Sequence, residues 1–578
     1  MNTLQERRIF FICCLFFGIF FALGGRLAYL QLIKGRQLAA AAVAEHTLRL
    51  PVANFFRGDI QDCRGNSLLD GKRVYGVAVF PSLIPCSFGV EVSSSVEQHR
   101  WEDVFIEGLI NNLPQRCRDQ KLRAFLQGAM SKEVPFMLPV TLNEQETKSL
   151  SGMDISGVYL VPLPVRYEDG SLARHLIGYV KGSVPGGETQ KGIKGIEAAY
   201  DTVLTPPEQK LELLTVVDRR GELLKGRGLR LRGSQGVLVK GKNVVLTLDS
   251  NIQRKVEEIM DKYGVRGAVS VVDVATGEVR ALASRPLYDQ ISGAGDQFDR
   301  SLALYHPGSV FKIVVAAAAL AEGRVRPDER FFCSGKYSFN DKEGIACWKK
   351  EGHGNLTFRE AFAHSCNPVF VEVALRLGGR TLERYARLLG LEGGLGGYLP
   401  QRQLGTVQIG SYPGQVGNAA LGQEGVMVSP LNAAVLAATV ARGGIYIPPQ
   451  VVKAITDADG RTEKLFMSAT KRRVLSPEVA RELQKMMELT VTRGTGKRAG
   501  VEGVGSAGKT GSAETGIHDA KGNPVADSWF VGYAPSARPQ LAVAVVVEGG
   551  GAGGGLAAEM FREILKSIYR PGGLERNN

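Results

Sequence analysis

Three short motifs in this chain bring together the residue types needed to attack a carbonyl group. They are Ser309-Val-Phe-Lys312, Ser365-Cys-Asn367 and Lys509-Thr-Gly511. In this order they supply a nucleophilic hydroxyl, a lysine base, a second hydroxyl, an amide and a cation. The combination predicts an enzyme that opens an amide or β-lactam carbonyl and holds the acyl group on serine, because a serine beside a base can form such an intermediate.

The first motif predicts an activated serine at the start of a helix. Pro307 and Gly308 interrupt the chain, and residues 310–321 have a strongly helical composition. Ser309 and Lys312 then lie one turn apart on one face, and the helix dipole favours negative charge at Ser309. Lys312 can accept a proton only when neutral, which requires burial or a nearby cation. Taken alone, the motif also fits a capping serine followed by a solvated lysine.

The second motif, Ser365-Cys-Asn367, follows a predicted helix over about residues 356–363, and Pro368 is expected to force a loop. Ser365 could relay a proton between Lys312 and a leaving amine, while the Asn367 amide could hold a substrate carbonyl. A helix C-terminus with turn residues is the alternative interpretation.

The third motif continues as Lys509-Thr-Gly-Ser512 in a predicted strand. Gly511 would permit the close approach of a ligand backbone. Lys509, Thr510 and Ser512 suit a substrate carboxylate, and the charge of Lys509 would help to lower the pKa of Lys312. The N–H group of Ser512, with that of the nucleophile, would form an oxyanion hole. An exposed lysine on an edge strand is the alternative.

The elements that must position these motifs favour an α+β or α/β sandwich. Alternating apolar residues and turn signals predict strands at 244–248, 268–274, 278–283, 504–515, 529–533 and 541–548, and helices at 250–263 and 556–569. The segment between them is mainly helical. Because the strands come from both ends of this region, distant parts of the sequence must share one sheet.

The N-terminus predicts a membrane anchor. Arg7 and Arg8 precede an uncharged apolar run over residues 9–25, and the apolar character resumes after Arg26 as far as Ile33. About 20 apolar residues span a bilayer, and Arg26 can extend its charge to the headgroups. The basic residues ahead of the span predict a cytoplasmic tail and an extracytoplasmic body. A cleaved signal peptide is the alternative, although no clear cleavage site follows.

The composition is that of a large globular protein. The chain has 578 residues, of which 44% are hydrophobic and 22% charged, and a formal net charge of +13. This length predicts two or three folded units. A basic surface suits an anionic membrane, an acidic polymer or simple solubility. No zinc-finger spacing or Lys/Arg-dense arm is present, so nucleic acid is not an expected partner.

The eight cysteines and seven histidines show no familiar metal-ligand spacing, so no metal is expected. Cys333 and Cys347 flank a short segment and either close a small loop as a disulfide or remain buried thiols. Two other cysteines fall in the apolar span, and the remaining four look isolated; these six are Cys13 and Cys14, then Cys63, Cys86, Cys117 and Cys366.

The three motifs and their surroundings resemble the class B, monofunctional penicillin-binding proteins. In the second half the similar segments are Tyr305–Lys312, Ala420–Gly425 with Ser429-Pro-Leu431, and Trp529–Pro535. In the first half they are Arg57-Gly-Asp-Ile60, Leu172–Val180, and Gly195-Ile-Glu197 with Tyr200-Asp201. Three positions depart from the family pattern: His306 stands where acidic residues are common, Glu424 interrupts a G-Q-G segment, and Ser512 replaces the commoner threonine.

The resemblance implies a peptidoglycan D,D-transpeptidase without a cofactor. Ser309 would attack the D-Ala–D-Ala carbonyl of a stem peptide, expel D-alanine and pass the acyl group to an amine; β-lactams would acylate the same serine. Lys312, Ser365, Asn367 and Lys509 would share the catalysis. The implied fold is α+β, with a central antiparallel sheet flanked by helices, as in β-lactamases, and a strand-rich pedestal.

The resemblance also implies an arrangement along the chain. The expected parts are a cytoplasmic tail (1–8), a transmembrane anchor (9–33), a pedestal or dimerisation domain (34–240), a transpeptidase domain (241–570) and a flexible tail (571–578). No glycosyltransferase domain is evident, so glycan polymerisation would come from a polytopic membrane partner. A homodimer, and a role in elongation, division or sporulation, are left open.

Other functions remain as alternatives. A β-lactamase-type hydrolase would need a base for deacylation and would hardly need a pedestal. A β-lactam sensor would have several membrane spans, and a non-catalytic scaffold would be expected to have lost part of the catalytic set.

Overall fold

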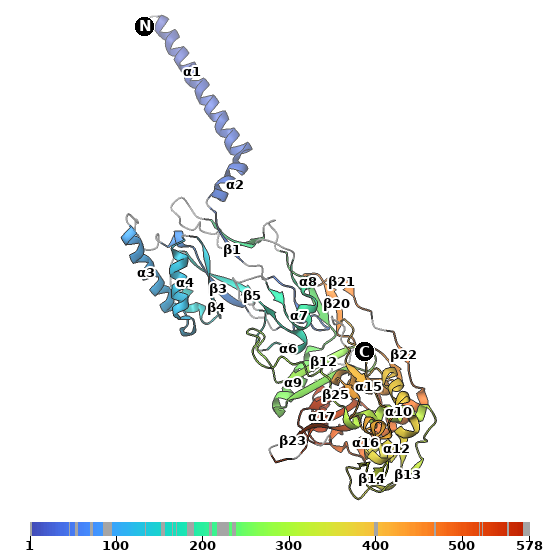
Figure 1. Cartoon of the computed structure of the whole chain (residues 1–578). Helices are drawn as coiled ribbons and strands as arrows, with labels where there is room; N and C mark the ends of the chain where they lie inside the picture. The colour runs from blue at the N-terminus through green and yellow to red at the C-terminus, as the bar shows by residue number, and fades with distance from the viewer. Residues whose placement is uncertain are drawn as a thin grey trace.

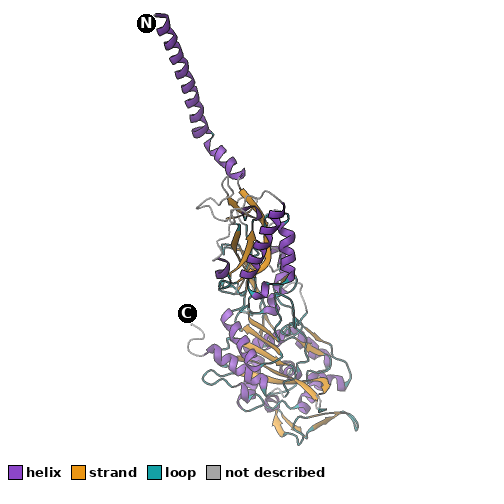
Figure 2. Cartoon of the chain, turned by 90° about the vertical axis from the view of Figure 1, so that its left-hand side faces the viewer, coloured by secondary structure: helices purple, strands orange, loops and turns teal. Residues whose placement is uncertain are grey.

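The computed structural model shows an elongated molecule with the N-terminal helix at one end and two bodies in line below it (Figures 1 and 2). The structure describes residues 3–45, 47–52, 56–69, 73–84, 95–132, 134–151, 157–164, 166–168, 170–181, 190–206, 211–216, 230–233, 239–397, 403–467, 470–518, 521–522, 524–551 and 554–569. The expected tail at 571–578 lies outside these residues. We call residues 47–233 the N-terminal body and residues 243–569 the C-terminal body.

The C-terminal body is built on a five-stranded antiparallel sheet. Its order is β12-β11-β25-β24-β23, and the strands are β11 (Gly267–Asp273), β12 (Val279–Arg285), β23 (Ala507–His518), β24 (Pro524–Ala534) and β25 (Leu541–Val547). The first two strands pair with the last three through β11 and β25. The prediction that distant segments share one sheet is therefore confirmed, and the fold is α+β.

Helices cover both faces of this sheet. Alternate residues of β11 point to opposite faces: Val269 and Val271 pack with α9 (Ser250–Tyr263) and α17 (Leu556–Tyr569), while Ala268 and Val272 join the core on the other side. That second face is covered by α15 (Pro430–Ala441), α10 (Lys312–Ala321) and α16 (Pro477–Thr492). Both faces of the sheet are therefore covered over most of its area, which makes it a rigid support for residues at its edge.

A further group of elements follows α10 in the chain. It comprises β13 (Arg330–Cys333), β14 (Lys336–Ser338), β15 (Gly344–Ala346), β16 (Gly354–Thr357), α11 (Phe358–Ala363), α12 (Asn367–Leu377), α13 (Gly379–Leu388) and α14 (Pro413–Ala420). Thr357 and Glu360 form a capping box that starts α11. Pro368 does not force a loop as predicted; it occupies the first turn of α12, where its missing N–H has no helical partner to lose.

The N-terminal body contains two three-stranded sheets. One has the order β4-β3-β5, and the other β1-β8-β9. Their bounds are β3 (Arg73–Val79), β4 (Phe136–Leu142), β5 (Val158–Pro164), β1 (Thr47–Val52), β8 (Leu211–Val216) and β9 (Arg230–Gly233). Helices α3 (Ser95–Asn112) and α4 (Gln120–Met130) share a core with the first sheet.

The two bodies are joined by packing and by a shared sheet. Strand β2 (Ile60–Gln61) pairs in parallel with β10 (Asn243–Leu246). The same sheet is completed by β20 (Val452–Thr456), which pairs with β10, and by β21 (Thr462–Leu465). Ile60, Leu176 and Ile196 belong to the same buried cluster as the helices of the C-terminal body. Residues near the junction therefore fold against the C-terminal core.

The N-terminal helix α1 (Thr3–Ala28) continues through a π-helical stretch (Tyr29–Ile33) and leads to α2 (Gly35–Glu45). Among the described residues, Arg7–Ile33 is the one helical segment long and apolar enough to cross a membrane, and none of its most apolar window is buried. Its exposed phenylalanines and leucines would be costly in water, which fits insertion into a bilayer.

Candidate active site

Ser309 lies in a short 3-10 helix (Gly308–Phe311) directly before α10, so the regular α-helix starts two residues later than predicted. The turn packs closely on β23. Gly308 has φ +56°, and a Cβ atom there would come within 2.3 Å of the Ser512 carbonyl oxygen. A Cβ atom at Gly511 would come within 2.7 Å of the Pro307 oxygen. Gly511 is thus needed so that the backbone at Pro307 can approach β23. This contact places Ser309 beside the third motif.

Lys312 is the first residue of α10, and its side chain is completely buried. Its Nζ atom donates to the Ser365 carbonyl oxygen (2.8 Å) and to Asn367 Oδ1 (2.7 Å), and lies 3.3 Å from Ser365 Oγ. Burial lowers the pKa of Lys312 to about 7, against the opposing effect of the nearby Cys366 and Cys347 sulfurs. The neutral amine needed for a base is therefore accessible near neutral pH.

Ser365 lies between the two lysines. Its hydroxyl is within hydrogen-bond distance of Lys312 and accepts from Lys509 Nζ at 2.9 Å. Its backbone has φ +54°, a left-handed conformation that is unusual for a residue other than glycine. This conformation ends the turn after α11 and directs the hydroxyl between both amines. Strain of this kind persists where the surroundings hold it firmly.

Lys509 is also completely buried, and its Nζ atom donates to the Thr510 carbonyl oxygen at 3.0 Å as well as to Ser365. Burial lowers the pKa of Lys509 well below its usual value, and the charge of Lys312 adds to the effect. The alternative of an exposed edge-strand lysine is wrong. Two amines that share one hydroxyl disfavour simultaneous protonation.

These residues meet at a cavity of about 740 Å³. Six of the eight predicted site residues line it: Ser309, Ser365, Asn367, Thr510, Gly511 and Ser512. Lys312 and Lys509 lie beneath this surface, in hydrogen-bond contact with Ser365. The structure therefore brings all three motifs to one place, with polar groups on the wall and two buried amines behind them.

Several lining residues were not predicted from the sequence. Thr495 donates or accepts a 2.6 Å hydrogen bond with the Thr510 hydroxyl. Its only sequence signal is a glycine on each side, Gly494 and Gly496. Trp348 also lines the cavity, and nothing in its local sequence marks it. The site is therefore wider than its three motifs.

The departures from the family pattern leave the site intact. The ring of His306 hydrogen-bonds to the Val426 carbonyl oxygen through Nδ1 (2.8 Å). Glu424 accepts from Asn418 at 3.4 Å, while the Gly422 carbonyl oxygen accepts from Gly308 N–H at 3.1 Å. The loop carrying Glu424 thus still closes on the turn that holds Ser309.

Comparison with known proteins identifies the family. Residues 267–566 match the "Penicillin binding protein transpeptidase domain", and residues 54–244 match the "Penicillin-binding Protein dimerisation domain". The chain belongs to the penicillin-binding protein transpeptidase family.

Individual relatives agree with this assignment. "Stage V sporulation protein D" of Bacillus subtilis is 28% identical over 98% of this chain and 86% of its own length. "Peptidoglycan D,D-transpeptidase PbpA" of Mycobacterium tuberculosis is 30% identical over 57% of this chain and 73% of its own length. A chain of the solved structure "Structural coordination of polymerization and crosslinking by a peptidoglycan synthase complex" has a TM-score of 0.68 and 26% identity, covering 98% of this chain and 100% of that one.

In this penicillin-binding protein, the motifs of the N-terminal half meet in a buried ion-pair network. Glu197 accepts from Arg57 Nε (2.8 Å), Arg166 Nε (2.6 Å) and the Tyr167 hydroxyl (2.9 Å), and all four side chains are buried. Arg57 also pairs with Asp201 at 2.7 Å. The segments beginning at Arg57 and Gly195 are therefore joined through opposite charges.

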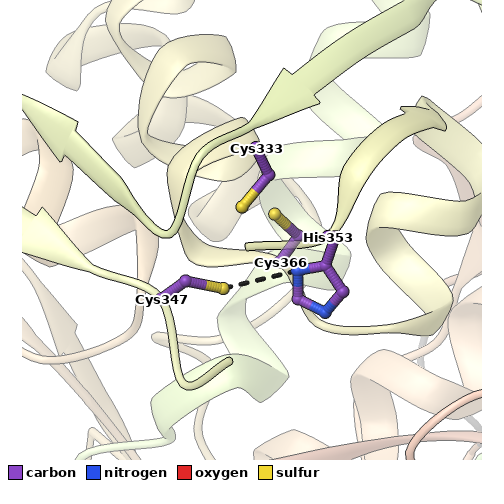
Figure 3. A group of neighbouring side chains, drawn as sticks. All are labelled: Cys333, Cys347, His353 and Cys366. Atoms are coloured by element: carbon purple, nitrogen blue, oxygen red, sulfur yellow. Dashed lines mark hydrogen bonds between the residues drawn. The ribbon is translucent and has the colours of Figure 1, made fainter. Parts of the chain in front are cut away.

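The structure chooses between the two alternatives for Cys333 and Cys347. Cys333 and Cys347 are free thiols, both buried. Cys366, which was expected to be isolated, lies with them and with His353 in one cluster (Figure 3). The expectation that Cys366 is isolated is wrong because the four residues are irregularly spaced in the sequence and only the fold brings them together.

Proposed function

We propose that this chain is a membrane-anchored peptidoglycan D,D-transpeptidase that cross-links stem peptides through an acyl-Ser309 intermediate. The observation that carries the proposal is the completely buried Lys312, one turn from Ser309 and bonded to Ser365 and Asn367. A buried amine that titrates near neutrality can remove the proton from a serine hydroxyl.

In the proposed acylation, Ser309 Oγ attacks the penultimate D-Ala carbonyl carbon while its proton passes to Lys312 Nζ. The backbone N–H groups of Ser309 and Ser512 stabilise the oxyanion. The C–N bond then breaks, and Ser365 delivers a proton to the departing D-alanine amine. An acceptor amine attacks the acyl-enzyme, loses a proton to the same base system, and releases Ser309.

Substrate binding follows from the same wall of the cavity. The hydroxyls of Thr510 and Ser512 hold the terminal carboxylate, with the buried amine of Lys509 behind them. Asn367 holds a backbone carbonyl of the stem peptide through its amide. A β-lactam offers the same carboxylate and carbonyl, but its leaving group stays attached after the ring opens.

The test is covalent labelling of the detergent-solubilised full chain with a fluorescent penicillin, followed by intact-protein mass measurement. The wild-type chain should gain one stable adduct, and Ser309→Ala none. Ser411→Ala, at an exposed serine, is the matched control and should label normally. Persistent label on Ser309→Ala would refute the role of Ser309 as the nucleophile. Release of the label from the wild-type chain within seconds would favour a hydrolase.

Cross-linking itself requires a donor and an acceptor. A peptide ending in D-Ala–D-Ala should release D-alanine, and an added D-amino acid should appear in the product. If only hydrolysed product forms, the hydrolase is supported. If the chain labels with penicillin but turns over no peptide, the sensor is supported.

We further propose that the segment 9–33 anchors the chain, with residues 1–8 cytoplasmic and the rest outside. The apolar helix and the preceding Arg7 and Arg8 support this orientation. Added trypsin should degrade both bodies in spheroplasts. Protection in spheroplasts together with degradation in inverted vesicles would reverse the topology.

We also propose a division into a pedestal at 34–240 and a transpeptidase domain at 241–570, and a polytopic membrane glycosyltransferase as partner. Support for the partner comes from the similar chain in a solved peptidoglycan synthase complex of polymerization and crosslinking. Co-purification of such a polymerase with the full chain, and its loss when the pedestal is exchanged, would test the pairing.

A further inference from the structure

Four potential metal ligands converge beside the second active-site motif. They are Cys333 at the end of β13, Cys347 after β15, His353 before β16, and Cys366 at the start of α12. One ligand atom from each lies within 4.8 Å of the other three, and Figure 3 shows the side chains pointing toward one another. The three cysteines are at most 4% exposed and His353 is half-buried, so the sulfur atoms are shielded from solvent.

The separations suit a tetrahedral ion. Zn–S bonds of about 2.3 Å and Zn–N bonds of about 2.1 Å place two tetrahedral ligands about 3.6–3.8 Å apart. Cys347 Sγ lies 3.5 Å from His353 Nδ1, close to the expected S···N edge. Three thiols and one imidazole form a common closed zinc-ligand set, and such soft ligands disfavour magnesium and calcium.

Simpler interpretations leave part of the cluster unexplained. A disulfide would use two of the three sulfurs and leave a thiol and the imidazole. Buried thiols alone could pack as apolar groups, but His353 Nε2 is buried without a hydrogen-bond partner among the described residues. Nδ1, which lies 3.5 Å from Cys347 Sγ, is the ring nitrogen placed to bind a metal, and Nε2 would then carry the ring proton.

We propose that Cys333, Cys347, His353 and Cys366 bind one zinc ion as a structural clamp of the active site. Binding would form three Zn–S bonds and one Zn–N bond and would release the three thiol protons to solvent. Four protein ligands leave no open coordination position, so the ion would have no part in the acyl-transfer chemistry.

The clamp would join the wall of the substrate cavity to the catalytic motif. Cys366 separates Ser365 from Asn367, and Asn367 Nδ2 donates to the Ala346 carbonyl oxygen at 3.0 Å, one residue before Cys347. Trp348 Nε1 donates to the His364 carbonyl oxygen at 2.9 Å.

Both Ala346 and Trp348 line the cavity. Two hydrogen bonds therefore join the same segments that the proposed metal bonds would join. Without the ion, the segment carrying this wall would depend on those hydrogen bonds alone, and the cavity would lose its shape.

The first test uses zinc as the probe and needs no activity. The detergent-solubilised full chain is equilibrated with zinc, desalted and analysed for metal by mass spectrometry. About one zinc per chain is expected, following the one closed site. Cys347→Ser and His353→Ala should bind much less, while Cys63→Ser, outside the cluster and half-buried, should bind as the wild type does. Cobalt in place of zinc should give the thiolate-to-metal absorption of a tetrahedral site.

The overturning results are defined for the same samples. The site would be refuted if the wild-type chain held no zinc, or if Cys347→Ser held as much zinc as the wild type. An intramolecular disulfide among these cysteines in freshly purified chain, detected by mass after thiol alkylation, would also refute it. Because metal content is independent of penicillin labelling, failure here leaves the proposed transpeptidase untouched.

The second test concerns the clamp. Removing zinc with a chelator should slow penicillin acylation about tenfold or more, as expected when a reacting group is misplaced by about 1 Å, and added zinc should restore the rate. A wild-type chain that loses its zinc yet acylates at an unchanged rate would refute the clamp. Circular dichroism of the same samples should show that the chain stays folded.

Discussion

Buried charge is handled in opposite ways in the two halves of the molecule. Around Glu197, two guanidinium groups and one carboxylate are paired at 2.6–2.8 Å. Around Ser365, two lysines approach one hydroxyl, and no carboxylate accepts from either amine among the hydrogen bonds of the described residues. The side chains of Glu197, Lys312 and Lys509 are all completely buried, so the difference lies in compensation.

The pKa directions show what this difference does. Although burial opposes it, the guanidinium groups of Arg166 and Arg57 lower the pKa of Glu197, so the carboxylate stays charged and fixed. Burial lowers the pKa of Lys312 to about 7, so that amine can gain or lose a proton under physiological conditions. Compensated charge gives a fixed joint, and uncompensated charge gives a group able to transfer protons.

The largest expected effect comes from removing the uncompensated charge. Lys312→Met keeps an unbranched side chain, one atom shorter, but abolishes the base, so penicillin acylation should fall by about 10³-fold or more. The melting temperature should stay equal or rise, because a costly buried amine is replaced by an apolar group. The measurements are stopped-flow acylation and calorimetry. A large fall in melting temperature would mean that Lys312 is a structural residue.

The opposite result is expected in the N-terminal half. Glu197→Gln leaves Arg166 buried without its counter-charge and Arg57 with Asp201 alone, so the free energy of unfolding should fall by about 3–5 kcal/mol. Chemical denaturation measures this, and the folded fraction should still acylate at a rate close to wild type. Asp328→Asn, at an exposed carboxylate paired with Arg359, is the control and should change little. If Glu197→Gln and Asp328→Asn lowered the free energy of unfolding equally, the buried ion pairs would be no more stabilising than the surface pair.

The sequence was sufficient to predict elements that depend on residues close together in the chain. The serine turn, the strand of Lys509 and the helices α9 and α17 carry local signals: glycine and proline breaks, apolar alternation and capping residues. A single shared sheet was predictable because strands lie at both ends of the region, but the order of its strands was not predicted. Pro368 was misjudged because the same residue can end one helix or occupy the first turn of the next.

Contacts between distant residues could not be predicted. Lys312 and Ser365 are 53 positions apart, and Ser365 and Lys509 are 144 apart, so only the resemblance joined them. Residue spacing gives no indication of the Cys/His cluster, whose members come from three strand ends and a helix start. Such sites depend on tertiary packing, which no local pattern specifies.

The smallest expected effect, and the most direct probe of the uncompensated site, is the pH dependence of acylation. Since the pKa of Lys312 is lowered to about 7, the amine is mostly protonated below pH 7 and mostly neutral above it. Only the neutral amine accepts the Ser309 proton, so the rate should rise through pH 7 and fall about tenfold per pH unit on the acid side.

Acylation by a fluorescent penicillin between pH 5.5 and 8.5, at constant ionic strength, measures this profile. Glu197→Gln should leave its midpoint unchanged, because its charge lies in the other cluster. A midpoint near the ordinary lysine value, about 10.4, would show that Lys312 is not desolvated during the reaction, and the contrast between the two buried clusters would then disappear.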